Sequence, residues 1–120
     1  MSRLKLSDLS PSRQALVRLC QRLNFGLIQS IAVRDADPVF EPNNVVLVDE
    51  KLDASDKPRP EAELTDFDLA AELCRLMTRL DEIRNGRIER IEVRGGIPRR
   101  VVFESCISEL FSLEKTDPSR

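Results

Sequence analysis

Apolar residues recur at helical spacing in an early stretch of the chain. The positions that share one face of a helix are Leu16, Leu19, Cys20 and Leu23. Ser10 and Pro11 precede this stretch, and both are typical of a helix start, because serine caps free N–H groups and proline fits the first helical position. Gly26 is typical of the residues that follow a helix. The pattern predicts a helix that begins at Ser10–Pro11 and ends near Asn24.

A later stretch of the chain predicts a second amphipathic helix. Its apolar stripe consists of Phe67, Ala70, Leu73, Cys74, Met77, Leu80 and Ile83. We expect Thr65 to be the N-cap, with Asp66 and Asp68 in the first turn, where the helix dipole favours acidic side chains. Asn85 and Gly86 are expected to end this helix.

Each helical stretch is followed by residues typical of a β-hairpin. Turns are indicated at residues 34–38 and 95–98, the second of which contains two glycines. The flanking segments are rich in valine and isoleucine, which favour strands. The expected strands are residues 27–34, 45–49, 87–94 and 99–104.

Two sequence motifs occur twice, in the same order. The first reads LVRLCQRL at residues 16–23 and LCRLMTRL at residues 73–80, and the second reads G-x-I-x-x-I-x-V-R-x-x-x-P at residues 26–38 and 86–98. Across both motifs, 11 of 21 aligned positions are identical. This similarity predicts an internal duplication.

The duplication defines an expected organisation within a single domain of residues 1–120. Repeat one covers about residues 10–49, a linker with two prolines covers about 50–64, and repeat two covers about 65–104. A short amphipathic helix at about 105–114 is expected to close the chain.

These elements predict an α+β fold made of two tandem helix plus β-hairpin (αββ) units. One unit of about 40 residues is too small to bury both its helix stripe and its sheet face. We therefore expect the units to share a four-stranded, largely antiparallel sheet, with two helices on one face and an approximate two-fold axis between the units. An exchange of units between two chains is an alternative.

Composition narrows the expected location and thiol chemistry. The chain is 41% hydrophobic and 33% charged. It contains no apolar run near the roughly 18 residues of a membrane span and no apolar core of a secretory signal at its N-terminus. We therefore expect a cytoplasmic protein without membrane contact. Its three cysteines lack close spacing, which indicates reduced thiols. Cys20 and Cys74 lie on the apolar stripes, so Cys106 is the candidate for reactivity.

The sequence contains no histidine, tyrosine or tryptophan. The lack of histidine excludes Ser/His and Cys/His catalysis and His-ligated zinc, and we expect no enzyme activity, cofactor or metal. Asp35, Asp37 and Glu41 offer oxygen atoms, but their spacing differs from that of a calcium loop and is typical of a turn. The lack of clustered aromatic rings disfavours stacking on nucleic-acid bases.

Arginines are concentrated in the second hairpin and form one candidate site. These are Arg87, Arg90, Arg94, Arg99 and Arg100, and they predict contacts with phosphates. The competing interpretation is ion pairing with Glu89, Glu92 and neighbouring carboxylates. The formal net charge of −2 favours this second interpretation, because dedicated nucleic-acid binders are usually basic.

The two repeats differ most on the outer face of the sheet. Ser30, Ala32 and Arg34 stand in repeat one where repeat two has charged residues, so we expect this region to be covered by the C-terminal helix or by a second subunit. The resulting functional prediction is a non-enzymatic interaction or scaffold module that forms a homodimer or binds a protein partner. The alternative is a regulator that binds nucleic acid or another polyanion through the arginine-rich hairpin.

Overall fold

The computed structural model describes residues 4–53 and 60–105, and these form two helices, five strands and two short 3₁₀ helices. In chain order they are η1 (Leu6–Asp8), α1 (Pro11–Leu23), β1 (Phe25–Arg34), β2 (Asp37–Val39), β3 (Val46–Val48), η2 (Pro60–Glu63), α2 (Ala71–Ile83), β4 (Gly86–Arg94) and β5 (Ile97–Phe103). The fold is α+β, as the sequence predicts. Cys106 and all but the first residue of the expected C-terminal helix lie outside the described residues.

Helix α1 begins where the sequence predicts. The Ser10 hydroxyl accepts a hydrogen bond from the Arg13 N–H at 3.3 Å, and Pro11 occupies the first helical position. The helix ends at Leu23, and the Asn24 N–H donates to the Cys20 carbonyl. Its buried face includes Leu16, Val17, Cys20 and Leu23.

Helix α2 begins at Ala71, so the predicted start at Thr65 is wrong. The carboxylate of Asp66 accepts hydrogen bonds from the Ser7 N–H at 2.9 Å and the Ser7 hydroxyl at 2.8 Å. These bonds hold the pKa of Asp66 below its ordinary value, and the bond from the Ser7 N–H has the largest effect. The backbone beside it also bonds to the N-terminal segment, through Leu6 N–H to Phe67 carbonyl at 3.0 Å. The carboxylate that could have served the first turn of a helix is therefore used to fasten residues 4–9.

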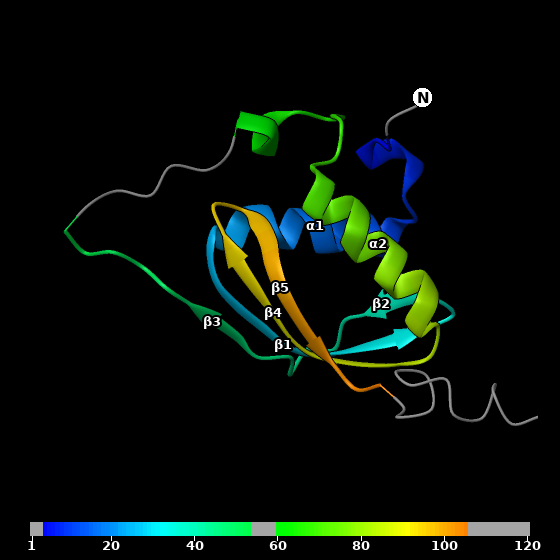
Figure 1. Cartoon of the computed structure of the whole chain (residues 1–120). Helices are drawn as coiled ribbons and strands as arrows, with labels where there is room; N and C mark the ends of the chain where they lie inside the picture. Colours follow the sequence, from blue (N-terminus) through cyan, green and yellow to red (C-terminus); the bar gives the residue numbers. More distant parts are fainter. Residues whose placement is uncertain (1–3, 54–59, 106–120) are drawn as a thin grey trace, which may run out of the picture.

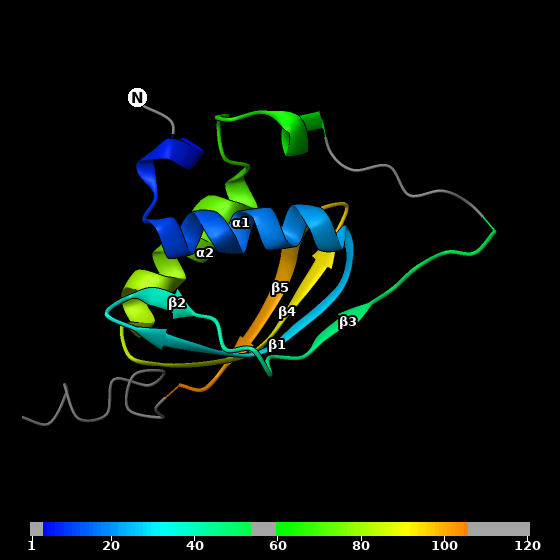
Figure 2. The same ribbon diagram turned by 180° about the vertical axis from the view of Figure 1, so that it is seen from behind.

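The sheet is antiparallel and has the strand order β2-β1-β4-β5, with β3 also paired to β1. Both long helices lie on the same side of the curved sheet, as Figures 1 and 2 show. A single core cluster unites the buried stripes of the helices with the inward residues of β1, β4 and β5. Strands β1 and β4, each of which follows one of the two helices, pair with each other at the centre of the sheet.

The sheet has five strands rather than the expected four, because the return segment of the first hairpin is interrupted. Strand β2 pairs with the end of β1 at Ala32–Arg34, and β3 pairs with its beginning at Gly26–Ile28. Between them the chain turns, and Asn44 fixes the turn: its side chain accepts from the Glu41 N–H and donates to the Ser30 carbonyl at 3.0 Å. Strand β3 is thus a separate strand at the sheet edge.

Four isoleucines meet where β1 and β4 pair. Ile28 lies opposite Ile91, and Ile31 lies opposite Ile88, and all four are fully buried. In the twice-occurring motif, Ile28 corresponds to Ile88 and Ile31 to Ile91. Each isoleucine of the first motif therefore faces the non-equivalent isoleucine of the second, which is the register that a two-fold axis between the strands would produce.

Both hairpins turn through two residues with positive φ. These are Asp35 and Ala36, at 51° and 67°, and Gly95 and Gly96, at 61° and 77°. Two consecutive positive φ angles define the tight hairpin turn whose twist fits antiparallel strands. The tight second turn places the start of β5 at Ile97, two residues earlier than expected.

Gly26 lies where β3 approaches β1 most closely. A Cβ atom at this position would lie 2.0 Å from the Leu47 carbonyl oxygen, a backbone atom that cannot move unless β3 moves. We expect Gly26→Ala to separate β3 from β1 and to lower the free energy of unfolding by about 2 kcal/mol, a typical cost of overpacking. Hydrogen exchange should then accelerate at the Gln29 and Asp49 amides, which bond across this strand pair.

The matched control for this substitution is Gly86→Ala, at the corresponding position of the second motif. There a Cβ atom would meet only the Ile83 Cγ2 methyl group, at 3.2 Å, and a side chain can yield where a backbone cannot. We expect a change within about 0.5 kcal/mol, since alanine also restricts the unfolded chain. Equal effects of the two substitutions would contradict the close approach of β3.

Candidate interaction surfaces

The three residues predicted as an interaction surface occupy different environments. Ser30 is exposed and has a φ of 57°, and its carbonyl accepts hydrogen bonds from Asn44 and, at 3.1 Å, from Arg87. Arg34 is exposed at the end of β1. Ala32 is only 7% exposed in a single copy of the chain. The apolar member of the predicted surface is therefore already covered before any second chain binds.

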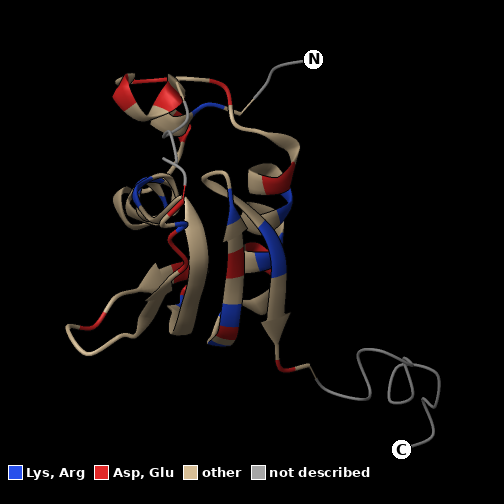
Figure 3. Cartoon of the chain, turned by 90° about the vertical axis from the view of Figure 1, so that its left-hand side faces the viewer, with Lys and Arg blue, Asp and Glu red and all other residues tan. Residues whose placement is uncertain are grey.

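The five candidate polyanion contacts do not gather on one surface. Arg99 bonds to Glu72 of α2, on the helix-covered side of the sheet. Arg94 pairs with Glu92 at 3.0 Å. Figure 3 shows acidic residues between the basic ones along β4. Most of these arginines therefore already have a partner within the chain.

Arg90 and Arg100 lie near each other on the outer face of the sheet, and Arg100, on the end strand β5, also lines the groove beside α2. With Leu27, Glu92 and Val102 they line a hollow of about 90 Å³. Neither arginine forms an ion pair with another residue in the described part of the chain. Two cations beside one carboxylate make a small basic patch, much smaller than the predicted set of five.

A groove of about 240 Å³ separates α2 from β5. Its arginines are Arg75, Arg79, Arg99 and Arg100. Arg99 is paired with Glu72, while the Arg79 guanidinium pairs with Glu82 and lies 5.1 Å from the centre of the Phe103 ring. Apolar lining comes from Leu76, Pro98 and Val101. The groove thus combines an apolar floor with a basic rim. It could not be predicted from the sequence, because half of its lining comes from α2 and half from β5, and only the fold brings these two elements together.

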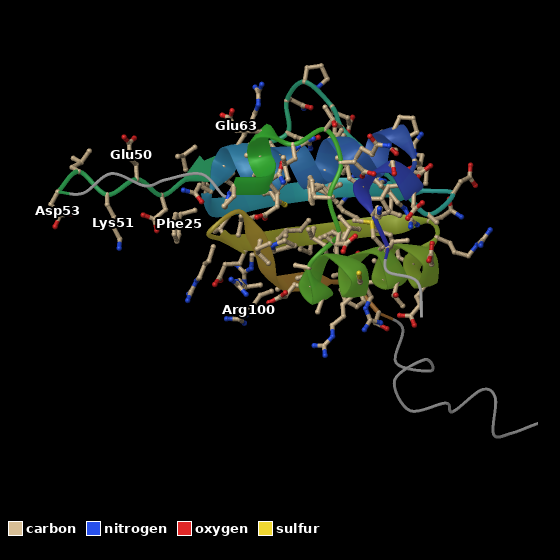
Figure 4. The ribbon with its side chains drawn as sticks, turned by 90° about the horizontal axis from the view of Figure 1, so that it is seen from above. Phe25, Glu50, Lys51, Asp53, Glu63 and Arg100 are labelled. Atoms are coloured by element: carbon tan, nitrogen blue, oxygen red, sulfur yellow. The ribbon has the colours of Figure 1, made fainter. Side chains whose placement is uncertain are left out.

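Among the described residues, most of the exposed large apolar side chains lie on or beside β3. The side chains of Val45, Leu47, Val48 and Leu52 are 50%, 47%, 68% and 93% exposed. From β3 the chain runs away from the body through residues 49–53, as Figures 1 and 4 show. The sequence does indicate this apolar edge. A strand with one solvated face alternates apolar and polar residues, whereas residues 45–48 read VVLV without a polar residue.

The backbone of β3 is bonded on one side only. Val45 accepts from the Gln29 N–H at 3.0 Å, and the Asp49 N–H donates to the Phe25 carbonyl at 2.8 Å. Backbone groups alternate in direction along an antiparallel strand, so Val46 and Val48 direct theirs to the opposite side. No described strand pairs with that side. The outer edge of β3 therefore offers both free backbone groups and apolar side chains.

A polar cluster joins α1, the first hairpin turn and α2. Arg13 is its centre: its guanidinium donates to the Ala36 carbonyl at 2.8 Å and pairs with Asp81, and it lies 3.5 Å from Asp37. Asp37 also accepts from the Ser10 hydroxyl at 2.7 Å. These bonds hold structural elements together, and they occupy one of the carboxylates considered above as a metal ligand. Within residues 4–53 and 60–105, no group of three or more potential metal ligands occurs.

The two cysteines in the described residues are unpaired thiols. Cys20 is fully buried, and desolvation raises the pKa of its thiol to about 12. The neutral thiol is not a nucleophile at physiological pH, so this position acts as a small core residue. Cys74 is half-buried on α2.

Comparisons with protein families, with curated proteins and with solved structures find no match to this chain. Among the described helices, none has the length and apolar character needed to cross a membrane.

Proposed function

We propose that this protein is a non-enzymatic interaction module that self-associates, and that the outer edge of β3 is its contact surface. The observation that carries the proposal is an edge strand with free backbone groups and exposed apolar side chains. Proteins usually protect such edges with charges, prolines or covering segments. At β3 the exposed positions Val45, Leu47 and Val48 are instead apolar, which is typical of a strand that pairs with another chain.

The proposed contact is modest in strength. Covering the exposed parts of Val45, Leu47 and Val48 would contribute about 3 kcal/mol, at roughly 1 kcal/mol for each half-exposed side chain. Backbone hydrogen bonds along the strand would add specificity. Such a contact favours association that depends on concentration over a permanent oligomer.

Light scattering and sedimentation across a range of concentrations test the proposal. We expect the wild-type chain to associate as its concentration rises, and Leu47→Lys to weaken that association by about tenfold, because a charged side chain resists burial in the contact. The matched control is Leu64→Lys, since Leu64 is 49% exposed and Leu47 is 47% exposed. A wild-type chain that stays monomeric at high concentration, or equal effects of the two substitutions, would contradict the proposal.

We also propose that the two helix–hairpin units arose by duplication. The support is the identity of 11 of 21 aligned positions, together with the pairing of Ile28 with Ile91 and of Ile31 with Ile88. The proposed location is the cytoplasm, supported by cysteines without the spacing of a disulfide framework.

The alternative function, binding of nucleic acid or another polyanion, retains narrower support. It rests on the neighbouring Arg90 and Arg100, since Arg94 and Arg99 pair with carboxylates and Arg87 bonds to a carbonyl. A basic patch of this size favours a weak, salt-sensitive contact. The β3 edge is therefore the better supported surface.

A further inference from the structure

We infer that the partner of the β3 edge is a second copy of this chain, which receives it at the groove between α2 and β5. The inference rests on the proposed self-association and names the two surfaces that meet. The donor surface is the β3 arm, residues 45–53. The acceptor surface is the α2/β5 groove, with its rim of four arginines.

The β3 arm combines apolar and acidic side chains. Its exposed apolar residues are followed by Asp49, Glu50 and Asp53, against the single base Lys51. Figure 4 shows Glu50, Lys51 and Asp53 along the extended end of the arm, clear of the body. The arm is thus an extended, acidic segment with apolar anchors.

The α2/β5 groove has the opposite charge. Its four arginines are opposed by one lining carboxylate, that of Glu72, which is already paired with Arg99. Arg75 and Arg100 have no ion-pair partner within the described ranges. Between these cations, Leu76 and Val101 provide an apolar floor. An acidic strand with leucine and valine side chains complements this groove in both charge and polarity.

The backbone also favours this pairing. Strand β5 pairs with β4 and with no other described strand, so its second edge can accept an added strand. The β3 arm cannot reach that edge within its own chain, because β1 and β4 lie between β3 and β5 in the sheet. A β3 arm that fills the groove must therefore belong to another copy.

Pairing of two β3 arms with each other is less favourable. Each arm carries three carboxylates and one lysine, so two arms side by side bring like charges together. An arm in the groove replaces this repulsion with attraction to Arg75 and Arg100. The contact is then heterologous, with different surfaces on the two copies, and it can extend beyond a dimer.

Charge reversal on each surface tests the inference by sedimentation velocity. The arm variant is Asp49→Arg with Glu50→Arg, and the groove variant is Arg75→Glu with Arg100→Glu. We expect each variant alone to associate at least about tenfold more weakly than wild type, and a mixture of the two to associate again, because each keeps one native surface. The control for the groove variant is Arg22→Glu with Arg84→Glu, two exposed arginines outside the candidate surfaces, with the same change of charge.

The outcomes separate this inference from the proposed function. Wild-type association in the groove variant, together with its loss in Leu47→Lys, would overturn the groove as acceptor while leaving the β3 edge as a contact surface. Loss in both variants without recovery on mixing would show that the arm and the groove are not partners, and would also overturn the inference. A monomeric wild-type chain would remove the proposed function itself.

Discussion

Truncation of Ile91 to alanine is expected to lower the free energy of unfolding by about 3 kcal/mol, within the range typical of large-to-small core substitutions. Ile91 is fully buried on β4 and lies opposite Ile28 at the centre of the sheet. Removing its side chain leaves a cavity beneath both helices, since the core is one continuous cluster. Urea denaturation should show this loss of free energy. Thermal unfolding should show a decrease of about 10 °C in the melting temperature.

The corresponding substitution in the first motif provides an internal comparison. Ile31 is also fully buried, and it faces Ile88 as Ile91 faces Ile28. We expect Ile31→Ala to cost the same as Ile91→Ala within about 1 kcal/mol, because both side chains are fully buried and each lies opposite an isoleucine. The exposed Glu89 on β4 supplies the surface control, and Glu89→Ala should change stability by less than about 0.5 kcal/mol. If only one of these two substitutions lowered the free energy of unfolding substantially, β1 and β4 would not contribute equally to the core.

The helix ends show how far local signals extend. Ser10 and Pro11 act on their own helix, so the start of α1 follows directly from the sequence. The start of α2 does not, because the partner of Asp66 is Ser7, 59 residues earlier in the chain. Capping patterns describe only neighbouring residues, and here tertiary hydrogen bonds engage the Asp66 carboxylate, which was expected in the first turn of the helix. The boundary of α2 could not have been predicted without the fold.

The candidate surfaces show a similar limit. The position of Arg99 and Arg100 on one strand could have been predicted, and both line the α2/β5 groove. The pairing of Arg99 with Glu72 could not, because it depends on where α2 lies over β5. The sequence shows that these strands are rich in arginine, but only the fold determines which of the arginines pair with carboxylates.

Replacement of Ala32 by arginine is expected to destabilise the folded chain by about 3 kcal/mol, because it forces a long charged side chain into a covered position. From the sequence alone, Ala32 belongs to a surface that a second subunit covers, and the same substitution would then disrupt only association. In the structure Ala32 is 7% exposed in a single copy, between Val39 of β2 and Arg87 of β4. The two interpretations therefore predict different results for the isolated monomer.

Thermal unfolding at a concentration low enough to keep the chain monomeric distinguishes them. The matched control is Glu92→Arg, which places the same side chain at the corresponding position of the second motif, where the native side chain is 27% exposed and pairs with Arg94. We expect Glu92→Arg to cost no more than about 1 kcal/mol, since it loses a surface ion pair and adds a like charge beside Arg90 and Arg100 on a partly exposed face. We expect Ala32→Arg to lower the melting temperature by about 10 °C. An unchanged melting temperature in Ala32→Arg, with association abolished, would move the contact from the β3 edge to the outer face of the sheet. A lowered melting temperature in Ala32→Arg but not in Glu92→Arg assigns Ala32 to the stability of each chain, and leaves β3 as the surface through which the chains meet.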